Sequence, residues 1–165
     1  MVAILHNIRS LHNVGSILRT ADGAGIEKLY LCGITPSPLD RFGSVRSDIA
    51  KVALGAEKSV AFENIKSTSR LIDKLRKDGF KIVALEQDKR AVSYYEYGRN
   101  PSPAKAGTPF RKGRMALIVG AEVDGIPKTI LAKADTIIEI PMVGAKESLN
   151  VSVAFGIAAF HLKNV

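Results

Sequence analysis

The stretch from Ile140 to Phe160, IPMVGAKESLNVSVAFGIAAF, joins the end of an apolar strand to a long apolar helix. Between them lies a polar segment, residues 144–148, which is followed closely by Asn150. Serine and asparagine side chains both accept hydrogen bonds from the first free amides of a helix, so either Ser148 or Asn150 explains how this helix begins. A helix start needs only one such residue. The presence of both predicts a loop that is shaped around a further contact.

Outward from this stretch, short apolar strands alternate with helices along the chain. Strands are expected at residues 2–5, 29–32, 59–62, 80–85, 115–119 and 136–140. Helices are expected from a cap at Asn13 to about Gly23, and at residues 46–54, 67–78, 127–134 and 149–163. Several strands are continuous apolar runs, as a sheet that is covered on both faces requires. The alternation predicts one α/β domain over residues 1–165, with a mostly parallel sheet flanked by helices.

The first predicted helix carries an arginine outside its apolar face. The apolar residues recur at the spacing of one helix face and are Val14, Ile17, Leu18 and Ala21. Arg19 lies about 140° around the helix from Val14, near Gly15, which clears space beside it. Two interpretations remain open: an ordinary exposed helix arginine, or a guanidinium that binds a phosphate through paired hydrogen bonds.

A second polar cluster, IVGAEVDGIP at residues 118–127, includes the end of the strand expected at 115–119. Gly120 and Gly125 permit a tight backbone turn or the close approach of a ligand, and two carboxylates, Glu122 and Asp124, accompany them. In open parallel sheets, ligands bind beyond the carboxyl ends of the strands, where this cluster is expected to lie. The plainer interpretation is a strand-to-helix turn with proline at the helix start.

The chain is basic, and its positive charge is unevenly distributed along the sequence. The formal net charge is +8, and residues 89–114 contain seven basic residues against one acid, Glu96. Such a segment indicates either a polyanion partner or a solvated loop. Tyr94, Tyr95 and Tyr97 lie within it and fit base stacking or core packing equally well.

Composition and spacing argue against several classes of protein. No apolar run reaches the ~20 residues that a membrane span needs, and no secretory signal opens the chain. The single cysteine, Cys32, lies in an apolar run and is expected to be a buried thiol, which fits a cytoplasmic protein. His6, His12 and His161 lack metal-ligand spacing, so no metal site is expected.

Three motifs, taken in order, resemble those of one enzyme family. They are N-x-G-x-x-x-R-T-A from Asn13 to Ala21, V-G-x-E-x-x-G-I-P from Val119 to Pro127, and I-P-M-x-G-x-x-x-S-L-N-V-S-V-A from Ile140 to Ala154. The sequence resembles the SpoU (TrmH) family of RNA ribose 2′-O-methyltransferases, in the SPOUT superfamily. The resemblance covers essentially the whole chain and is to the minimal members, which consist of the catalytic domain alone.

The resemblance implies a fold, a cofactor and partners. The fold would contain a deep trefoil knot, in which the C-terminal segment passes through a preceding loop. S-adenosylmethionine would bind in the knotted loops of a homodimer whose active site lies near the subunit interface. The substrate would be RNA, with tRNA favoured over rRNA, and neither a membrane nor a metal is expected to take part.

The resemblance also assigns site residues. Arg19 corresponds to the catalytic arginine, and the residues around it are Asn13, Glu122, Ser148 and Asn150. The cofactor-binding positions are Ala84, Leu85, Glu86, Gly120, Ala121, Glu122, Ile140, Pro141, Met142, Ser148 and Leu149. Apart from the resemblance, contacts with RNA are expected from Arg9 and, in the basic segment 89–114, from Lys105, Arg111 and Lys112.

Methyl transfer to a ribose hydroxyl needs in-line placement, removal of the proton and stabilisation of the developing negative charge. Because arginine is too basic to remove the proton readily, Arg19 is expected to hold an RNA phosphate and polarise the hydroxyl, with Asn13 and Ser148 orienting it. The sequence leaves open whether that phosphate or Arg19 itself takes the proton. The main alternative is a non-catalytic RNA-binding protein on the same fold, and a weaker one is an unrelated nucleotide-binding α/β protein.

Overall fold

The computed structural model describes residues 1–98 and 113–165, and its strands form one parallel sheet in the order β3-β2-β1-β6-β4-β7-β5. The strands are β1 Val2–His6, β2 Lys28–Cys32, β3 Ala61–Ile65, β4 Lys81–Leu85, β5 Val92–Ser93, β6 Met115–Val119 and β7 Thr136–Glu139. Every neighbouring pair is parallel, so all carboxyl ends meet at one edge of the sheet. The predicted α/β class with a parallel sheet is confirmed.

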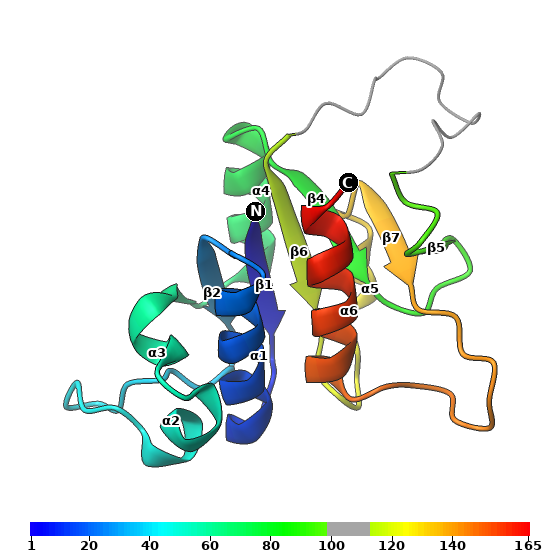
Figure 1. Ribbon diagram of the computed structural model, residues 1–165. Coiled ribbons are helices and arrows are strands. Elements are labelled where there is room, and N and C mark those ends of the chain that lie inside the picture. Colours follow the sequence, from blue (N-terminus) through cyan, green and yellow to red (C-terminus); the bar gives the residue numbers. More distant parts are fainter. Residues whose placement is uncertain (99–112) are drawn as a thin grey trace.

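Helices cover both faces of the sheet (Figure 1). They are α1 Leu11–Gly23, α2 Ser47–Ala53, α3 Ala56–Ser59, α4 Thr68–Lys77, α5 Lys128–Leu131 and α6 Val151–Lys163. Helices α1 and α6 lie side by side on one face, with α2 and α3 outside α1, and α4 and α5 lie on the other. Within β1, Ala3 and Leu5 pack into the α1–α6 layer, whereas Val2 and Ile4 pack into the α4–α5 layer. This two-sided burial is why the strand is apolar throughout rather than alternating.

The start of α1 differs from the sequence expectation. The N-cap is Ser10, whose Oγ accepts a hydrogen bond from the Asn13 amide, so the predicted cap at Asn13 is wrong. The helix therefore begins three residues earlier, and Asn13 belongs to its first turn with a side chain free for other contacts. The predicted apolar face is confirmed, since Val14, Ile17, Leu18 and Ala21 are all buried.

Short elements account for the other differences. Residues 56–59 form the helix α3, so β3 starts at Ala61, two residues later than expected, and runs on to Ile65. The two-residue strand β5 pairs with β7 and was not predicted, because two residues carry no periodic pattern.

Cys32 is buried as expected, and burial raises the pKa of its thiol to about 11. In the part of the chain that the structure describes, no helix has the length and apolar character needed to cross a membrane.

Gly15 sets the distance between α1 and α2. A Cβ atom at this position would lie 2.8 Å from the Ile49 carbonyl oxygen and 2.9 Å from the Val52 Cβ. Both contacts are shorter than real Cβ atoms show, so the two helices pack this closely only because residue 15 is glycine. The space beside Gly15 that the sequence predicts for Arg19 is therefore occupied by α2.

We predict that Gly15→Ala lowers the free energy of unfolding by about 1–2 kcal/mol, because overpacking outweighs the gain in helix propensity. The measurement is urea denaturation, followed by circular dichroism. The matched control is Gly156→Ala in α6, where the new methyl would meet only Thr20 Cγ2 at 3.5 Å, and stability should hold or rise. Equal stability of Gly15→Ala and wild type would contradict the close α1–α2 packing.

Candidate active site

A cavity of about 380 Å³ lies at the carboxyl ends of β4, β6 and β7. Three segments line it: residues 85–87 after β4, residues 119–125 after β6, and parts of 139–149 after β7, together with Val151 and Ala154 of α6. This is where the strand order of a parallel sheet creates a crevice, as expected from the sequence. Two of the three motif segments therefore meet in one cavity.

The first motif is joined to the other two through the side chain of Asn13. Its Nδ2 donates a hydrogen bond to Glu122 Oε1 at 2.7 Å, and its Oδ1 accepts one from Asn150 Nδ2 at 3.1 Å. Asn13 is only 6% exposed, although Glu122 and Asn150 are exposed, so both bonds are partly shielded from water. Residues separated by more than a hundred positions along the chain are thereby held at fixed mutual distances.

Asn150 also explains how α6 begins. Its Oδ1 accepts hydrogen bonds from the Ser152 amide at 2.9 Å and from Ser152 Oγ at 2.7 Å, which makes it the N-cap. One asparagine thus starts the helix with its oxygen and binds Asn13 with its amide nitrogen. Ser148, the other cap candidate, is exposed and lines the cavity instead. Asn150 therefore caps the helix, whereas Ser148 faces the cavity.

The turn after β6 is tight enough to require glycine at its first position. A Cβ on Gly120 would lie 2.4 Å from the carbonyl carbon of Gly125. Gly125 itself has a φ of 63°, in the left-handed region that glycine tolerates. Glu86, at the end of β4, accepts a hydrogen bond from the Ile126 amide with Oε2 at 2.7 Å. Its carboxylate therefore fixes the turn against β4, a role that the sequence did not indicate.

Gln87 is a further residue that sequence reasoning missed. Its Nε2 donates a hydrogen bond to the carbonyl oxygen of Glu147, which ties the segment before α6 to the end of β4. Figure 1 shows how far this segment extends from the sheet between β7 and α6. The position directly after a predicted strand was the available signal, since side chains there lie at the ligand-binding edge.

The cavity is acidic although the chain is basic. Carboxylates from three segments line it, at Glu86, Glu122, Asp124, Glu139 and Glu147, and among residues 1–98 and 113–165 no lysine, arginine or histidine does. The remaining lining includes apolar side chains at Leu85, Val119, Ile140, Met142 and Leu149. The arrangement suits a ligand that has both an apolar ring and a positive charge.

Most predicted cofactor-binding positions lie in the cavity lining, and two do not. The positions that line it are Leu85, Glu86, Gly120, Ala121, Glu122, Ile140, Met142, Ser148 and Leu149. Ala84 is fully buried inside the sheet, because its side chain packs into the α4–α5 layer. Pro141 is exposed and lies outside the lining. Val123 and Gly125 line the cavity and were not predicted.

Arg19 is separated from the cavity within one chain. It is exposed, does not line the cavity and makes no hydrogen bond or ion pair with any residue in 1–98 or 113–165. Six positions after Asn13, it lies about 120° around α1 and about 9 Å further along the axis. The expectation that Asn13 and Ser148 orient Arg19 is therefore not met inside a single chain, because the Asn13 side chain is engaged by Glu122 and Asn150.

Among the predicted RNA-binding residues, Arg9 lies at the rim of the cavity. Its guanidinium forms an exposed ion pair with Asp124, at 3.4 Å, and such pairs are weak enough to exchange partners. Lys105, Arg111 and Lys112 lie outside the described residues.

Tyr97 is buried and belongs to the core, whereas Tyr95 is exposed. Over residues 1–98 and 113–165, no group of three or more histidine, cysteine or acidic side chains has the arrangement of a metal site.

We predict that Asn13→Asp lowers the free energy of unfolding by about 1–3 kcal/mol, because a carboxylate would face Glu122 where an amide now donates. Adding Glu122→Gln should restore much of the loss, since the new amide can donate to the new carboxylate. A double-mutant cycle in urea denaturation measures the coupling. Additive effects of the two substitutions would contradict the hydrogen bond.

Comparison with known proteins bears on the whole chain. A family model described as the SpoU rRNA Methylase family matches residues 1–160. The 23S rRNA (guanosine-2′-O-)-methyltransferase RlmB of Salmonella typhi is 33% identical over 157 residues, which cover 95% of this chain and 57% of that protein. The chain thus spans little more than half the length of this curated relative.

Two solved structures have the same fold. The AdoMet-bound rRNA methyltransferase from Sinorhizobium meliloti superposes with a TM-score of 0.81 at 24% identity, over 99% of this chain and 55% of that one. The A. aeolicus TrmH/SpoU tRNA modifying enzyme superposes with a TM-score of 0.78 at 27% identity, over 99% and 73% of the two chains. With its three motif segments gathered at one edge of the sheet, and with the family model matching residues 1–160, the chain belongs to the SpoU methylase family.

Proposed function

We propose that this protein transfers a methyl group from S-adenosylmethionine to a ribose 2′-hydroxyl of RNA. The observation that carries the proposal is the hydrogen-bonded chain Glu122–Asn13–Asn150 beside the acidic cavity, in a member of the SpoU family. The names of the relatives support the same chemistry, since they include rRNA and tRNA enzymes.

The cavity fits the cofactor in size and chemistry. Its volume of about 380 Å³ is within the range of small-molecule sites. The apolar side chains, Leu85, Ile140 and Leu149 among them, provide surface for an adenine ring, and the carboxylates offset the positive charges of a sulfonium and an ammonium group. When bound, S-adenosylmethionine supplies an electrophilic methyl group.

The residues of the chain supply positioning and charge. Arg19 has no competing partner among the described residues, so its guanidinium is available to bind an RNA phosphate through two parallel hydrogen bonds. The bound phosphate, or Arg19 itself, is the group that we expect to take the proton from the ribose hydroxyl. Asn13 holds the Glu122 carboxylate and the start of α6 in place, and thereby fixes two walls of the site.

A second copy of the chain would bring Arg19 to the cavity. Arg19 does not reach its own cavity, and α6 exposes apolar side chains that an isolated chain leaves in water: Val153 is 51% exposed and Phe160 is 49% exposed. Burial of these side chains against a partner would stabilise a homodimer. In such a dimer, Arg19 of one subunit completes the cavity of the other.

Two finer features belong to the same proposal. The trefoil knot is supported by the sheet order, in which β4 lies between β6 and β7 although it precedes both in sequence. For the substrate, the tRNA predicted from the sequence stays a prediction, because the relatives modify rRNA in some cases and tRNA in others. Loss of a specific 2′-O-methyl nucleoside from the RNA of cells that lack the gene would identify the target.

The position of Arg19 outside the cavity also favours the non-catalytic alternative, an RNA-binding protein on the same fold. Calorimetric titration with S-adenosylmethionine separates the two. The enzyme binds the cofactor, whereas the RNA-binding protein shows no heat of binding.

We predict that wild-type protein incorporates labelled methyl groups into RNA, with the label recovered as a 2′-O-methyl nucleoside after digestion and mass spectrometry. Arg19→Ala and Arg19→Lys should each lose most of this turnover, because lysine keeps the charge but loses the paired hydrogen bonds. The affinity of both variants for S-adenosylmethionine should remain close to that of the wild type. The matched control is Arg70→Ala, an exposed helix arginine in α4 on the other face of the sheet. Activity of Arg19→Ala within about threefold of wild type, roughly 0.7 kcal/mol, would remove Arg19 from the mechanism.

A complementation test examines whether the site is shared between subunits. Arg19→Ala supplies an intact cavity, and Gly120→Ala supplies an intact arginine beside a blocked turn. Mixed by co-expression, they should recover about a quarter of wild-type activity, because half of the dimers are mixed and one of their two sites is complete. Sites confined to single chains would give no recovery.

A further inference from the structure

A short hairpin, residues 39–46, projects from the molecule between β2 and α2 (Figure 1). It is a built turn and not a loose loop. Asp40 Oδ1 accepts hydrogen bonds from the amides of Phe42 at 2.8 Å and Ser44 at 2.9 Å, and the Asp40 amide donates to the Ser44 carbonyl at 2.8 Å. Gly43 completes the turn with a φ of 81°.

The turn displays an aromatic ring and an arginine. Phe42 is 77% exposed, more than any other aromatic side chain in residues 1–98 and 113–165. The Arg41 guanidinium lies over its ring, 4.6 Å from the centroid. An exposed phenylalanine buries nothing in its own chain, and single exposed apolar residues are common. The paired arginine gives this one a further property, because an aromatic face beside a guanidinium offers both stacking and charge.

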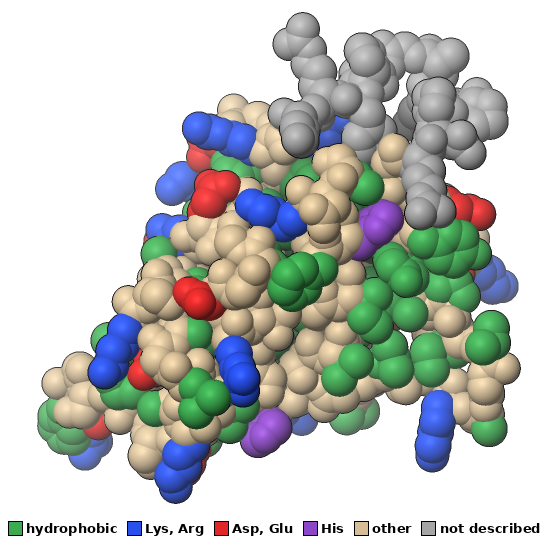
Figure 2. Space-filling view, in the orientation of Figure 1, with side chains coloured by type: hydrophobic (Ala, Val, Ile, Leu, Met, Phe, Trp, Pro, Cys, Tyr) green, Lys and Arg blue, Asp and Glu red, His purple; other side chains and the backbone are tan. Residues whose placement is uncertain are grey.

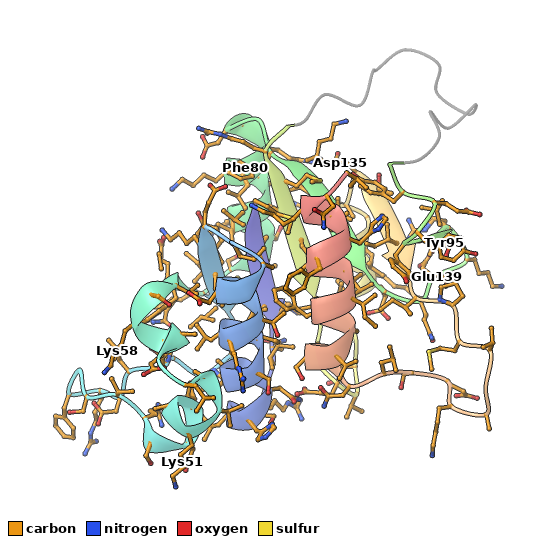
Figure 3. The ribbon with its side chains drawn as sticks, viewed as in Figure 1. Lys51, Lys58, Phe80, Tyr95, Asp135 and Glu139 are labelled. Atoms are coloured by element: carbon orange, nitrogen blue, oxygen red, sulfur yellow. The ribbon has the colours of Figure 1, made fainter. Side chains whose placement is uncertain are left out.

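Cationic side chains surround the hairpin. Arg46 is the last residue of the hairpin, and Lys51 and Lys58 extend outward from α2 and α3 (Figure 3). None of these four basic residues, Arg41 included, forms an ion pair within the described part of the chain. Two of the nearby acids are already engaged, since Asp40 holds the turn and Glu57 is buried against the Gly55 amide. Two exposed acids remain in this region: Asp48, and Asp22, whose Oδ1 accepts a hydrogen bond from Ser59 Oγ of α3 at 2.6 Å. Figure 2 shows lysine and arginine side chains over α2 and α3.

The hairpin lies on the side of α1 that carries Arg19. Helix α2 packs against Gly15, one turn before Arg19 on nearly the same face of α1. A strand that contacts Arg19 through a phosphate therefore passes α2 and the hairpin within a few nucleotides. The surface formed by Arg41, Phe42, Arg46, Lys51 and Lys58 is called the hairpin surface below.

We propose that the hairpin surface binds single-stranded RNA, with an unpaired base stacked on Phe42 and the backbone phosphates held by Arg41, Arg46, Lys51 and Lys58. The inference rests on the proposed function and adds a substrate-contacting surface separate from residues 89–114. RNA is the occupant because the surface combines unpaired positive charge with an exposed aromatic face, the pair of features that binding of single strands requires. A protein partner would need a larger apolar patch than one ring provides.

The chain contains no tryptophan, so Phe42→Trp places a single indole in the turn, which is excited selectively at wavelengths where the four tyrosines do not absorb. A short single-stranded RNA of mixed sequence should quench its emission, because a stacked base quenches an indole. Heparin, a polyanion without bases, should bind without comparable quenching. Absence of quenching by RNA at concentrations that saturate binding of labelled RNA would overturn the inference, and so would the absence of any RNA binding.

Substitutions separate stacking from charge. Phe42→Leu keeps an apolar side chain but no ring, and should weaken RNA binding about tenfold, whereas Phe42→Trp should retain it. The double variant Arg41→Gln/Arg46→Gln should reduce the slope of log affinity against log salt by about 1.4, as expected for two lost phosphate contacts with a single strand. The matched control is Lys74→Gln/Lys77→Gln in α4, which removes the same charge from the other face of the sheet. An unchanged slope and unchanged Phe42→Leu affinity would remove the hairpin from the RNA footprint.

Methyl incorporation and cofactor binding are measured on the same variants. Under the inference, the hairpin variants raise the KM for RNA and leave kcat and cofactor affinity near wild type. If wild type methylates RNA and the variants match it in KM, the hairpin inference fails and the proposed function stands. If RNA quenches the emission of Phe42→Trp yet wild type incorporates no methyl group, the proposed function fails and the RNA surface stands.

Discussion

The side chain of Asn13 is the one point at which α1, the turn after β6 and the start of α6 are joined by side-chain hydrogen bonds in the described structure. Asn13 itself is buried and its two bonds are partly buried, and an amide is the side chain that can satisfy both neighbours, since it donates to the Glu122 carboxylate and accepts from Asn150. A carboxylate or an apolar residue at position 13 would lose at least one of these two bonds. The shape of the cavity therefore depends on a single residue that lies outside its lining.

Steric limits act together with these bonds. Gly15 allows α2 to pack against α1, and Gly120 allows the turn after β6 to fold back on Gly125. The Glu86 carboxylate then fixes that turn to the end of β4, while Gln87 fixes the segment before α6. The hydrogen bonds of Glu86 and Gln87 both start directly after β4, at the carboxyl edge of the sheet. The rigid strands therefore position loops that have little regular structure of their own.

Charge is separated across the molecule. The cavity is lined by carboxylates, whereas the basic side chains of the hairpin surface and the exposed guanidinium of Arg19 form no ion pair within residues 1–98 and 113–165. This division would suit the proposed reaction between a cationic methyl donor and a polyanionic acceptor, since each ligand would be attracted to a different region. Helix α6 follows all of these segments in the chain, and its exposed apolar side chains are where the proposed second subunit would pack.

The sequence by itself determined the class of the fold and the place of the cavity. Continuous apolar strands require a sheet covered on both faces, the apolar stripe of α1 is buried as its spacing predicts, and the polar clusters after 119 and 140 lie at the carboxyl edge. Only the tertiary structure decided the start of α1 at Ser10, the capping of α6 by Asn150 with Ser148 left to the cavity, and the separation of Arg19 from it. The physical reason is how far along the chain each kind of interaction reaches. Periodicity and turn chemistry are local properties of a few residues, whereas the partner of a side chain such as Asn13 or Glu86 is chosen by distances between segments that meet only after the chain has folded.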